Sequence, residues 1–159
     1  MDALLTLLEE NALATPEVLA AQLKTTPDEI TKQIKQYEND RTILAYKAII
    51  DDEKAKRSNV KAVIEVRVTP EREGGFNKLA NRIAQYSEVH SCFLMSGGFD
   101  LLVFIEGRNL QEVAGFVSEK LSTLPGVLST ATHFNLKTYK QQGVLLQKTE
   151  HEERLQVSP

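Results

Sequence analysis

Residues 94–107 read LMSGGFDLLVFIEG, and this stretch decides how the chain folds. Two short apolar runs, residues 94–95 and residues 101–105, lie on either side of Gly97 and Gly98. Runs this short are typical of strands, and a double glycine is a common hairpin turn because glycine reaches positive φ without a steric penalty. The stretch therefore predicts two antiparallel strands. Its turn is either that of a plain hairpin, which the frequency of Gly-Gly turns favours, or one that holds a ligand against bare backbone.

The sequence on both sides of this hairpin predicts a sheet with two helices. Residues 60–69 alternate between apolar and polar side chains, which indicates a half-buried strand. Apolar residues recur at helical spacing in two further segments. The predicted order is a strand at 60–69, a helix at 76–85, strands at 89–96 and 100–107, a helix at 110–121 and a strand at 127–137. This β-α-β-β-α-β order is the ferredoxin-like arrangement, in which both helices cover one face of an antiparallel sheet.

The uncovered face of the predicted sheet carries apolar side chains. We assign Val63, Thr132 and Phe104 to this face. Antiparallel sheets usually bury an apolar face against another layer, and a large apolar patch left exposed marks an interaction site. The sequence therefore predicts a homodimer in which a second copy of the chain covers the face.

The first forty residues predict three short helices, and the second and third start at an N-cap threonine followed by a proline, at Thr15 and Thr26. The third start is the best marked, because Thr26 and Glu29 are spaced as a capping box around a proline at the first helical position. The expected helices span residues 2–10, 16–23 and 27–38.

The third helix has one apolar face. Ile30, Ile34 and Tyr37 fall on the same side at helical spacing, and the remaining side chains are polar. Two short helices, a tight turn and a third helix with a polar outer face predict a helix-turn-helix unit that reads DNA. A three-helix packing module with a solvated face explains the same pattern.

The predicted fold class is α+β, with an N-terminal winged helix-turn-helix joined by a linking strand to a C-terminal ferredoxin-like domain. The linking strand is expected at residues 43–50, which are rich in β-branched and aromatic side chains. The expected division is residues 1–50 for the helix-turn-helix with its linking strand, 51–59 for a charged linker, 60–140 for the ferredoxin-like domain and 141–159 for a tail, within which residues 148–154 are expected to be mobile or to form a short helix on a neighbouring subunit.

Composition limits the location and the chemistry of the protein. The chain has 159 residues, of which 42% are hydrophobic and 26% charged, enough for one ordinary domain or two small ones. No window approaches about 18 consecutive apolar residues, and the acidic start MDALLTLLEE does not resemble a secretion signal. The single cysteine, Cys92, excludes an intrachain disulfide. We therefore predict a cytoplasmic protein with no membrane partner.

Side chains suited to catalysis or metal binding are few. His90 and Cys92 share one face of the predicted second strand, but His133 belongs to the opposite edge of the sheet, so no metal site is predicted. Glu65 and Glu106 can form a carboxylate pair across neighbouring strands, although solvated strand faces commonly carry such residues. Phosphate-loop, GxSxG and HExxH motifs are absent from the sequence. We assign no catalytic residue and no cofactor.

Five stretches of the sequence together resemble the Lrp/AsnC family, the leucine-responsive and asparagine-type regulators. They are LLTLLEE at 4–10, VLAAQL at 18–23, IKQYENDRTILAYKAIID at 34–51, SGGFDLLV at 96–103 and LPGVLSTATHFNLK at 124–137. The likeness covers residues 2 to about 140, and its specificity lies in the order and spacing of the stretches. The resemblance implies a DNA-binding transcriptional regulator that dimerises through the linking strand and the sheet and often forms octamers. It also implies a small effector, commonly an amino acid, bound between ferredoxin-like domains near the glycine hairpin.

Two sets of candidate site residues follow, and in the second of them Gly97, Gly98 and Asp100 are what the resemblance implies by position. The DNA-binding set is Lys24, Thr25, Thr31, Lys32, Lys35 and Arg41. The effector-binding set is Met95, Ser96, Gly97, Gly98, Phe99, Asp100, Thr130 and Thr132. In the second set exposed glycine amides can receive a carboxylate, and Asp100 can pair an ammonium group. Asp100 is equally well explained as a side chain that caps its own turn.

The third helix departs from the family pattern. Members usually carry an early serine and a later arginine there, where this chain has Pro27 or Asp28 and Gln33. Residues 1–58 carry 8 Lys and Arg against 11 Asp and Glu, so the whole net charge of −3 lies in this part. We therefore expect weak, salt-sensitive DNA binding by each head, which the avidity of a dimer strengthens.

Two other functions remain open on the sequence. The same pairing of domains resembles the sirohaem decarboxylases, for which His90 and His133 are the interior candidates for proton chemistry. The other is an oligomerising interaction module whose head no longer binds DNA. The sequence identifies neither the effector nor the target DNA.

Overall fold

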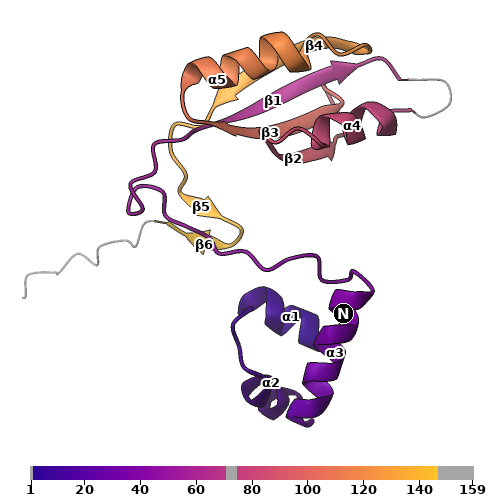
Figure 1. The fold of residues 1–159 in the computed structure, drawn as a ribbon, viewed down its shortest axis with the longest axis vertical. Coiled ribbons are helices and arrows are strands. Elements are labelled where there is room, and N and C mark those ends of the chain that lie inside the picture. The colour runs from indigo at the N-terminus through magenta and orange to yellow at the C-terminus, as the bar shows by residue number, and fades with distance from the viewer. Residues whose placement is uncertain (1, 71–74, 147–159) are drawn as a thin grey trace, which may run out of the picture. The chain divides into compact units, whose positions relative to one another are not determined.

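The computed structural model describes residues 2–70 and 75–146 (Figure 1). The chain divides into two compact units, Met1–Ala48 and Ile49–Pro159. We call them the helical unit and the sheet unit. The structure expected for residues 148–154 lies outside the described residues.

The helical unit contains the three expected helices, α1 (Ala3–Glu10), α2 (Pro16–Leu23) and α3 (Pro27–Asn39). The carboxylate of Asp2 accepts hydrogen bonds from the amides of Leu4 and Leu5 and so caps α1. The predicted capping box at the start of α3 is present, with the Glu29 amide donating to Thr26 Oγ1 and the Thr26 amide donating to Glu29 Oε2. These bonds satisfy backbone donors that a helix leaves free at its start.

A small apolar core holds the three helices together. It consists of Leu4, Leu8, Leu19, Ala20 and Ile30. The hydroxyl of Tyr37 donates to the carboxylate of Asp2, so a residue of α3 also binds the residue that caps α1. The predicted apolar face of α3, with Ile30, Ile34 and Tyr37, therefore faces this core.

The linking strand expected at residues 43–50 does not form in this chain. Ile43 donates its amide to the Tyr37 carbonyl at 2.9 Å, and residues 44–50 form no ladder with another described segment. Leu44 is 74% exposed and Tyr46 47% exposed. The prediction of a strand, and with it of a wing, is wrong for the single chain because strand propensity needs a neighbouring strand to pair with.

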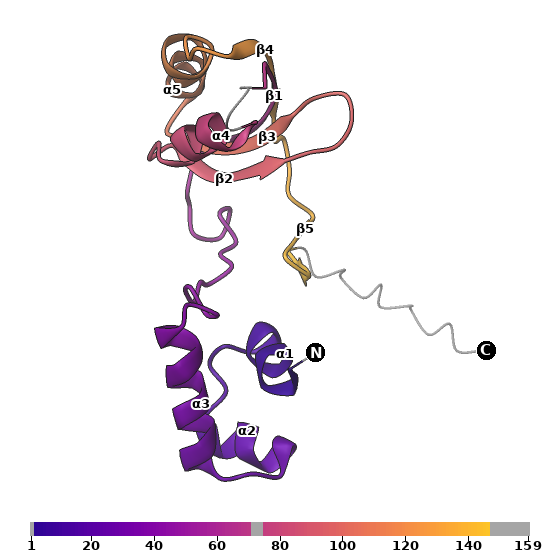
Figure 2. The ribbon, with the colours of Figure 1, turned by 90° about the vertical axis from the view of Figure 1, so that its right-hand side faces the viewer.

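The sheet unit has the predicted ferredoxin-like order (Figures 1 and 2). Its elements are β1 (Val60–Val68), α4 (Asn77–Ala84), β2 (Val89–Leu94), β3 (Leu101–Gly107), α5 (Leu110–Gly115), which continues as the π-helix η1 (Phe116–Leu121), and β4 (Val127–Phe134). The strands pair antiparallel in the order β2-β3-β1-β4. A separate hairpin, β5 (Lys140–Gln141) and β6 (Val144–Leu145), follows in the region where only a tail was expected.

The main core of the sheet unit lies between the sheet and its helices. Ile64, Val66 and Val103 face the helices and are fully buried, which confirms the alternation read from residues 60–69. Ile83 of α4 and Leu121 of η1 cover them. Both helices therefore lie on one face, as the fold class requires.

The opposite face of the sheet is apolar at its centre and uncovered. Val63 lies directly opposite Phe104, and the rings of Phe93 and Phe104 meet edge to face with centroids 5.9 Å apart. Phe93 is 51% exposed and Phe104 36% exposed. Thr132 was assigned to this face incorrectly, because it lies opposite the buried Ile64 and so on the helix-covered side.

Candidate functional site

The outer face of α3 is the candidate nucleic-acid interface. Ile30 is 1% exposed and faces the core, whereas Asp28, Lys32 and Lys35 are exposed. The spacing of these three residues, i, i+4 and i+7, places them in one stripe opposite Ile30. The stripe carries two cations and one carboxylate on a helix of 13 residues.

The residues expected to bind DNA lie at three places in the helical unit. Lys24 ends α2 in the left-handed conformation, with φ 55°, and leads into the turn at Thr25. Lys32 and Lys35 follow along the outer face of α3. Arg41 lies beyond the far end of α3, about 20 Å along the helix axis from the turn. The structure therefore brings together the turn and the start of α3 but not Arg41.

Both threonines of the expected DNA-binding set already hold hydrogen bonds within the helical unit. The Thr25 hydroxyl donates to the carboxylate of Glu29, and Thr31 Oγ1 donates to the carbonyl of Pro27 at 2.9 Å. Both side chains are half-buried. These hydrogen bonds stabilise the connection between α2 and α3 and the first turn of α3.

The helical unit is acidic. Residues 1–48 carry five Lys and Arg against eight Asp and Glu. The Thr25 hydroxyl, together with the amide and hydroxyl of Thr26, lowers the pKa of Glu29. The hydroxyl of Tyr37 lowers the pKa of Asp2 in the same way. These carboxylates stay ionised at neutral pH, and phosphate contacts depend on the few exposed lysines.

The glycine hairpin is the candidate effector site, and it is anchored to β1. The Met95 amide donates to the carbonyl of Asp100 at 2.8 Å and closes the turn. The Asp100 amide donates to the carbonyl of Val66 at 3.0 Å. The Val68 amide donates to Asp100 Oδ2 at 2.8 Å, next to a register shift in the pairing of β1 with β4.

Asp100 therefore has a structural partner that sequence reasoning missed. Its carboxylate binds the backbone of a neighbouring strand, 32 residues away in sequence, rather than capping its own turn. This hydrogen bond satisfies the Val68 amide where the ladder is irregular. The sequence carried a weak signal for it, an aspartate two residues after the double glycine.

The tip of the hairpin is open. Gly97 has φ 139°, a conformation that favours glycine, and a Cβ placed on Gly97 or Gly98 meets no atom within 4 Å. Met95 and Ser96 are exposed, and Phe99 is half-buried. A ligand can therefore approach the backbone at this tip without displacing a side chain.

Thr130 and Thr132 lie apart from the hairpin in the single chain. They are on β4, which is separated from β3 by β1, so about 10 Å lies between the two strands. Thr130 faces the helices and its Oγ1 lies 3.3 Å from Ser122 Oγ. The structure gathers residues 95–100 but not these two threonines.

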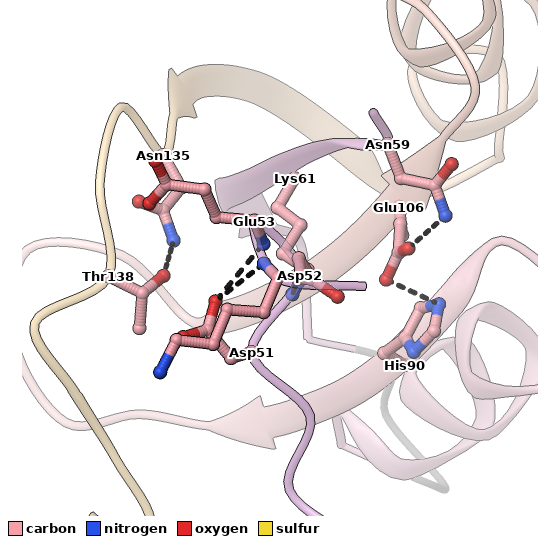
Figure 3. A network of polar contacts seen from close by, with 10 residues as sticks. Asp51, Asp52, Glu53, Asn59, Lys61, His90, Glu106, Asn135 and Thr138 are labelled. Atoms are coloured by element: carbon pink, nitrogen blue, oxygen red, sulfur yellow. Dashed lines mark hydrogen bonds and ion pairs between the residues drawn. The ribbon is translucent and has the colours of Figure 1, made fainter. Parts of the chain in front are cut away.

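A polar network that the sequence did not predict lies at the other end of the sheet (Figure 3). Lys61 pairs with Asp52, and the Asn59 side-chain amide donates to Glu106 Oε1 at 2.5 Å. Glu106 Oε2 lies 3.6 Å from His90 Nε2. Residues 51–59 were read as a solvated connector, yet part of this segment lines a cavity of about 230 Å³ together with the β5–β6 hairpin. Within this segment Lys54 pairs with Asp51, whereas Asp52 pairs with Lys61 of β1.

The carboxylate pair considered for Glu65 and Glu106 does not form, and His90 does not share a face with Cys92 as expected. Glu65 lies opposite Leu102, and Glu106 opposite Lys61, so the two carboxylates do not pair. His90 lies at a register shift between Val89 and Ser91, which sends its ring toward Glu106 on the open face.

Cys92 lies on the other side of the sheet from His90. It packs against the helix-side core, and burial raises the pKa of its thiol. The described residues contain no group of three potential metal ligands and no helix long and apolar enough to cross a membrane.

Comparison with known proteins covers both units. Residues 61–145 match the family described as the Lrp/AsnC ligand binding domain. The uncharacterized HTH-type transcriptional regulator YugG of Bacillus subtilis is 42% identical over 157 residues, which cover 98% of this chain and 95% of that protein. The HTH-type transcriptional regulator FL11 of Pyrococcus horikoshii is 30% identical over 112 residues, covering 70% of this chain and 71% of that protein.

A solved structure has a similar fold. It is a transcriptional regulator from Neisseria meningitidis in complex with L-Met, and it superposes with a TM-score of 0.69 at 24% identity. The superposition covers 89% of this chain and 93% of that one. An identity this low supports the fold and nothing further.

Proposed function

The chain belongs to the Lrp/AsnC family of transcriptional regulators, and from this premise we propose that it binds double-stranded DNA through the outer face of α3 under the control of a small effector. The family consists of regulators rather than enzymes, so the decarboxylase interpretation is set aside. The observation that carries the proposal is the exposed stripe of α3 in a unit where two short helices pack against α3 around a common apolar core. A cytoplasmic location follows from the proposed partner.

For the effector we propose an amino acid bound at the tip of the glycine hairpin. Support comes from the open backbone at Gly97 and Gly98, whose amides suit a carboxylate. The Neisseria meningitidis regulator with a similar fold was solved with L-Met, which suggests the ligand class to test first. Because Thr130 and Thr132 lie two strands away, they join this site only if a neighbouring copy supplies them.

The proposed assembly is a homodimer, with higher oligomers such as octamers built from it. The open face of the sheet exposes an aromatic pair beside Val63, which is the kind of surface that another copy covers. Residues 43–50 have strand-like composition and no strand partner in the described chain. A second copy supplies both missing partners at once.

A DNA titration at two salt concentrations tests the proposed function. Wild-type protein is expected to shift the region upstream of its own gene at low salt and to lose affinity steeply as salt rises. Replacing Lys32 and Lys35 together by alanine should reduce the salt dependence by about two counterions. Lys54→Ala, which removes an exposed lysine outside the helical unit, is the matched control. Adding amino acids one at a time then identifies the effector by the change in DNA affinity.

One observation favours a second function. The helical unit carries eight carboxylates against five cations, a balance that weakens binding to phosphates. An oligomerising module without DNA binding accounts for that balance. It predicts no salt-dependent shift with any DNA, together with normal oligomers by light scattering.

A further inference from the structure

The polar side chains of α3 divide into those held within the helical unit and those free to contact DNA. Four are held by hydrogen bonds: Glu29 by Thr25 and Thr26, Thr31 by the Pro27 carbonyl, Gln33 by the Tyr37 hydroxyl at 2.6 Å, and Glu38 by the Tyr46 hydroxyl at 3.2 Å. Asp28 makes neither a hydrogen bond nor an ion pair in the described part of the chain. It is exposed and lies in the first turn of α3.

Asp28 lies where a recognition helix meets base edges. In helix-turn-helix proteins the N-terminal residues of the second helix of the motif contact bases in the major groove. Asp28 shares the outer stripe of α3 with Lys32 and Lys35. When this face binds DNA, Lys32 and Lys35 contact phosphates or guanine edges. The carboxylate of Asp28 beside them then lies in the same major groove.

A carboxylate in the groove is repelled by phosphates unless it accepts a hydrogen bond from a base. The major groove offers two amino donors, N4 of cytosine and N6 of adenine. Adenine places the acceptor N7 beside its N6 amino group, and N7 repels a second acceptor, whereas the cytosine edge presents only the donor. An ionised aspartate therefore discriminates in favour of cytosine.

We propose that Asp28 is a specificity-determining residue of α3 that accepts a hydrogen bond from the N4 amino group of a cytosine in the target DNA, a role that rests on the DNA binding proposed above. The target site contains a C·G pair under the first turn of α3. Asp28 offsets its unfavourable charge only on that pair, so it lowers affinity for other sequences and raises the ratio of specific to non-specific binding.

Selection from random double-stranded DNA with the full chain tests this role. Wild type is expected to enrich sites with one invariant C·G pair, and to bind them about tenfold more tightly than sites with another pair at that position. Asp28→Ala should lose the preference at that pair alone and bind unrelated DNA more tightly. Asp28→Asn should move the preference toward adenine, because an amide pairs with N6 and N7 together. Glu9→Gln, the same loss of charge on the exposed side of α1, should keep the wild-type preference.

A base analogue gives an independent measurement. Replacing the selected cytosine by a pyrimidin-2-one, which lacks the N4 amino group, should cost wild type about tenfold in affinity and leave Asp28→Ala unchanged. If Asp28→Ala and wild type select the same sites, or if the variant gains affinity equally for every sequence, Asp28 does not read a base and the inference is wrong. A wild-type protein that retains no DNA even at low salt overturns the proposed DNA binding as well, whereas one that binds DNA but enriches no sequence overturns this inference alone. Circular dichroism of each variant checks that α3 is intact.

Discussion

The helical unit rests on a core cluster of five buried side chains, whereas the main cluster of the sheet unit contains thirteen. The helical unit is specified mostly by bonds between residues two to four apart, such as the capping box of α3. The sheet unit depends on strands that meet from distant parts of the sequence, as β1 meets both β3 and β4. The proposed DNA-reading unit is therefore specified by local contacts and stabilised by a small core. The proposed effector site belongs to a unit with a larger core.

Ile30→Ala should break the helical unit and spare the sheet unit. Ile30 is 1% exposed at the centre of the five-residue core, and truncation there costs about 2–5 kcal/mol. A unit of this size is held by about 2–7 kcal/mol in total. Hydrogen exchange followed peptide by peptide is expected to show α1, α2 and α3 exchanging freely while β1 and β3 stay protected.

Ile50→Ala is the matched control, because Ile50 is 39% exposed and the same atoms are lost. It should change the stability of either unit by less than about 1 kcal/mol. Loss of protection in both units of the Ile30→Ala protein would mean that the two units fold as one.

Asp100→Asn tests whether the hairpin aspartate serves the fold of the sheet unit. An amide oxygen is a weaker acceptor than a carboxylate for the Val68 amide, so we expect a loss of about 1–3 kcal/mol in the urea unfolding of the sheet unit. Ser96→Ala, in the same hairpin but exposed, should stay within about 0.5 kcal/mol of wild type. An Asp100→Asn protein as stable as wild type would leave the carboxylate available for an ammonium group of the effector.

The sequence predicted those features whose causes lie within a few residues. The capping box of α3, the alternation in β1 and the order of the ferredoxin-like elements all follow from local spacing, whereas the N-cap that the sequence offered at Thr15 makes no cap hydrogen bond. The face of α3 follows from the same spacing, which is why Lys32 and Lys35 were found as candidate contacts.

The features that the sequence did not predict depend on pairing between distant segments. Thr132 was placed on the wrong face because its register is set by β1, not by its own strand. His90 and Cys92 were expected on one face, but a register shift between β2 and β3 separates them. Asp100 binds a strand 32 residues away, and residues 43–50 lack a partner that only another segment or another copy can supply. In each case the conformation depends on a segment distant in the sequence, and the spacing of residues within one segment does not show which segment pairs with it.

Thr26→Ala should weaken the helical unit by about 1 kcal/mol, because the Glu29 amide loses its capping acceptor. Thr15→Ala is a close control: Thr15 is the N-cap residue of α2, yet its hydroxyl caps no backbone amide. The thermal unfolding of the helical unit should shift clearly for the first variant and little for the second. Equal shifts would indicate that the capping box does not specify α3.

Acid is expected to act on the helical unit more than on the sheet unit, with the smallest effect of the four. In the helical unit the pKa values of Asp2, Glu17, Glu29 and Asp40 are lowered by hydrogen bonds, and in the sheet unit those of Glu88 and Glu112 are lowered by Lys120 and Arg108. A carboxyl group with a lowered pKa stabilises the folded state above its unfolded pKa, near 4, and loses that contribution as the pH falls through the folded value. Hydrogen exchange compared at pH 6 and pH 3, after correction for intrinsic rates, should therefore show a larger loss of protection in α1 and α3 than in β1 and β3.

Glu29→Gln should reduce this difference, since it removes one of the groups that titrate. An equal loss in both units would show that the exposed carboxylates of the helical unit are too well solvated to matter, and that its small core alone sets its stability.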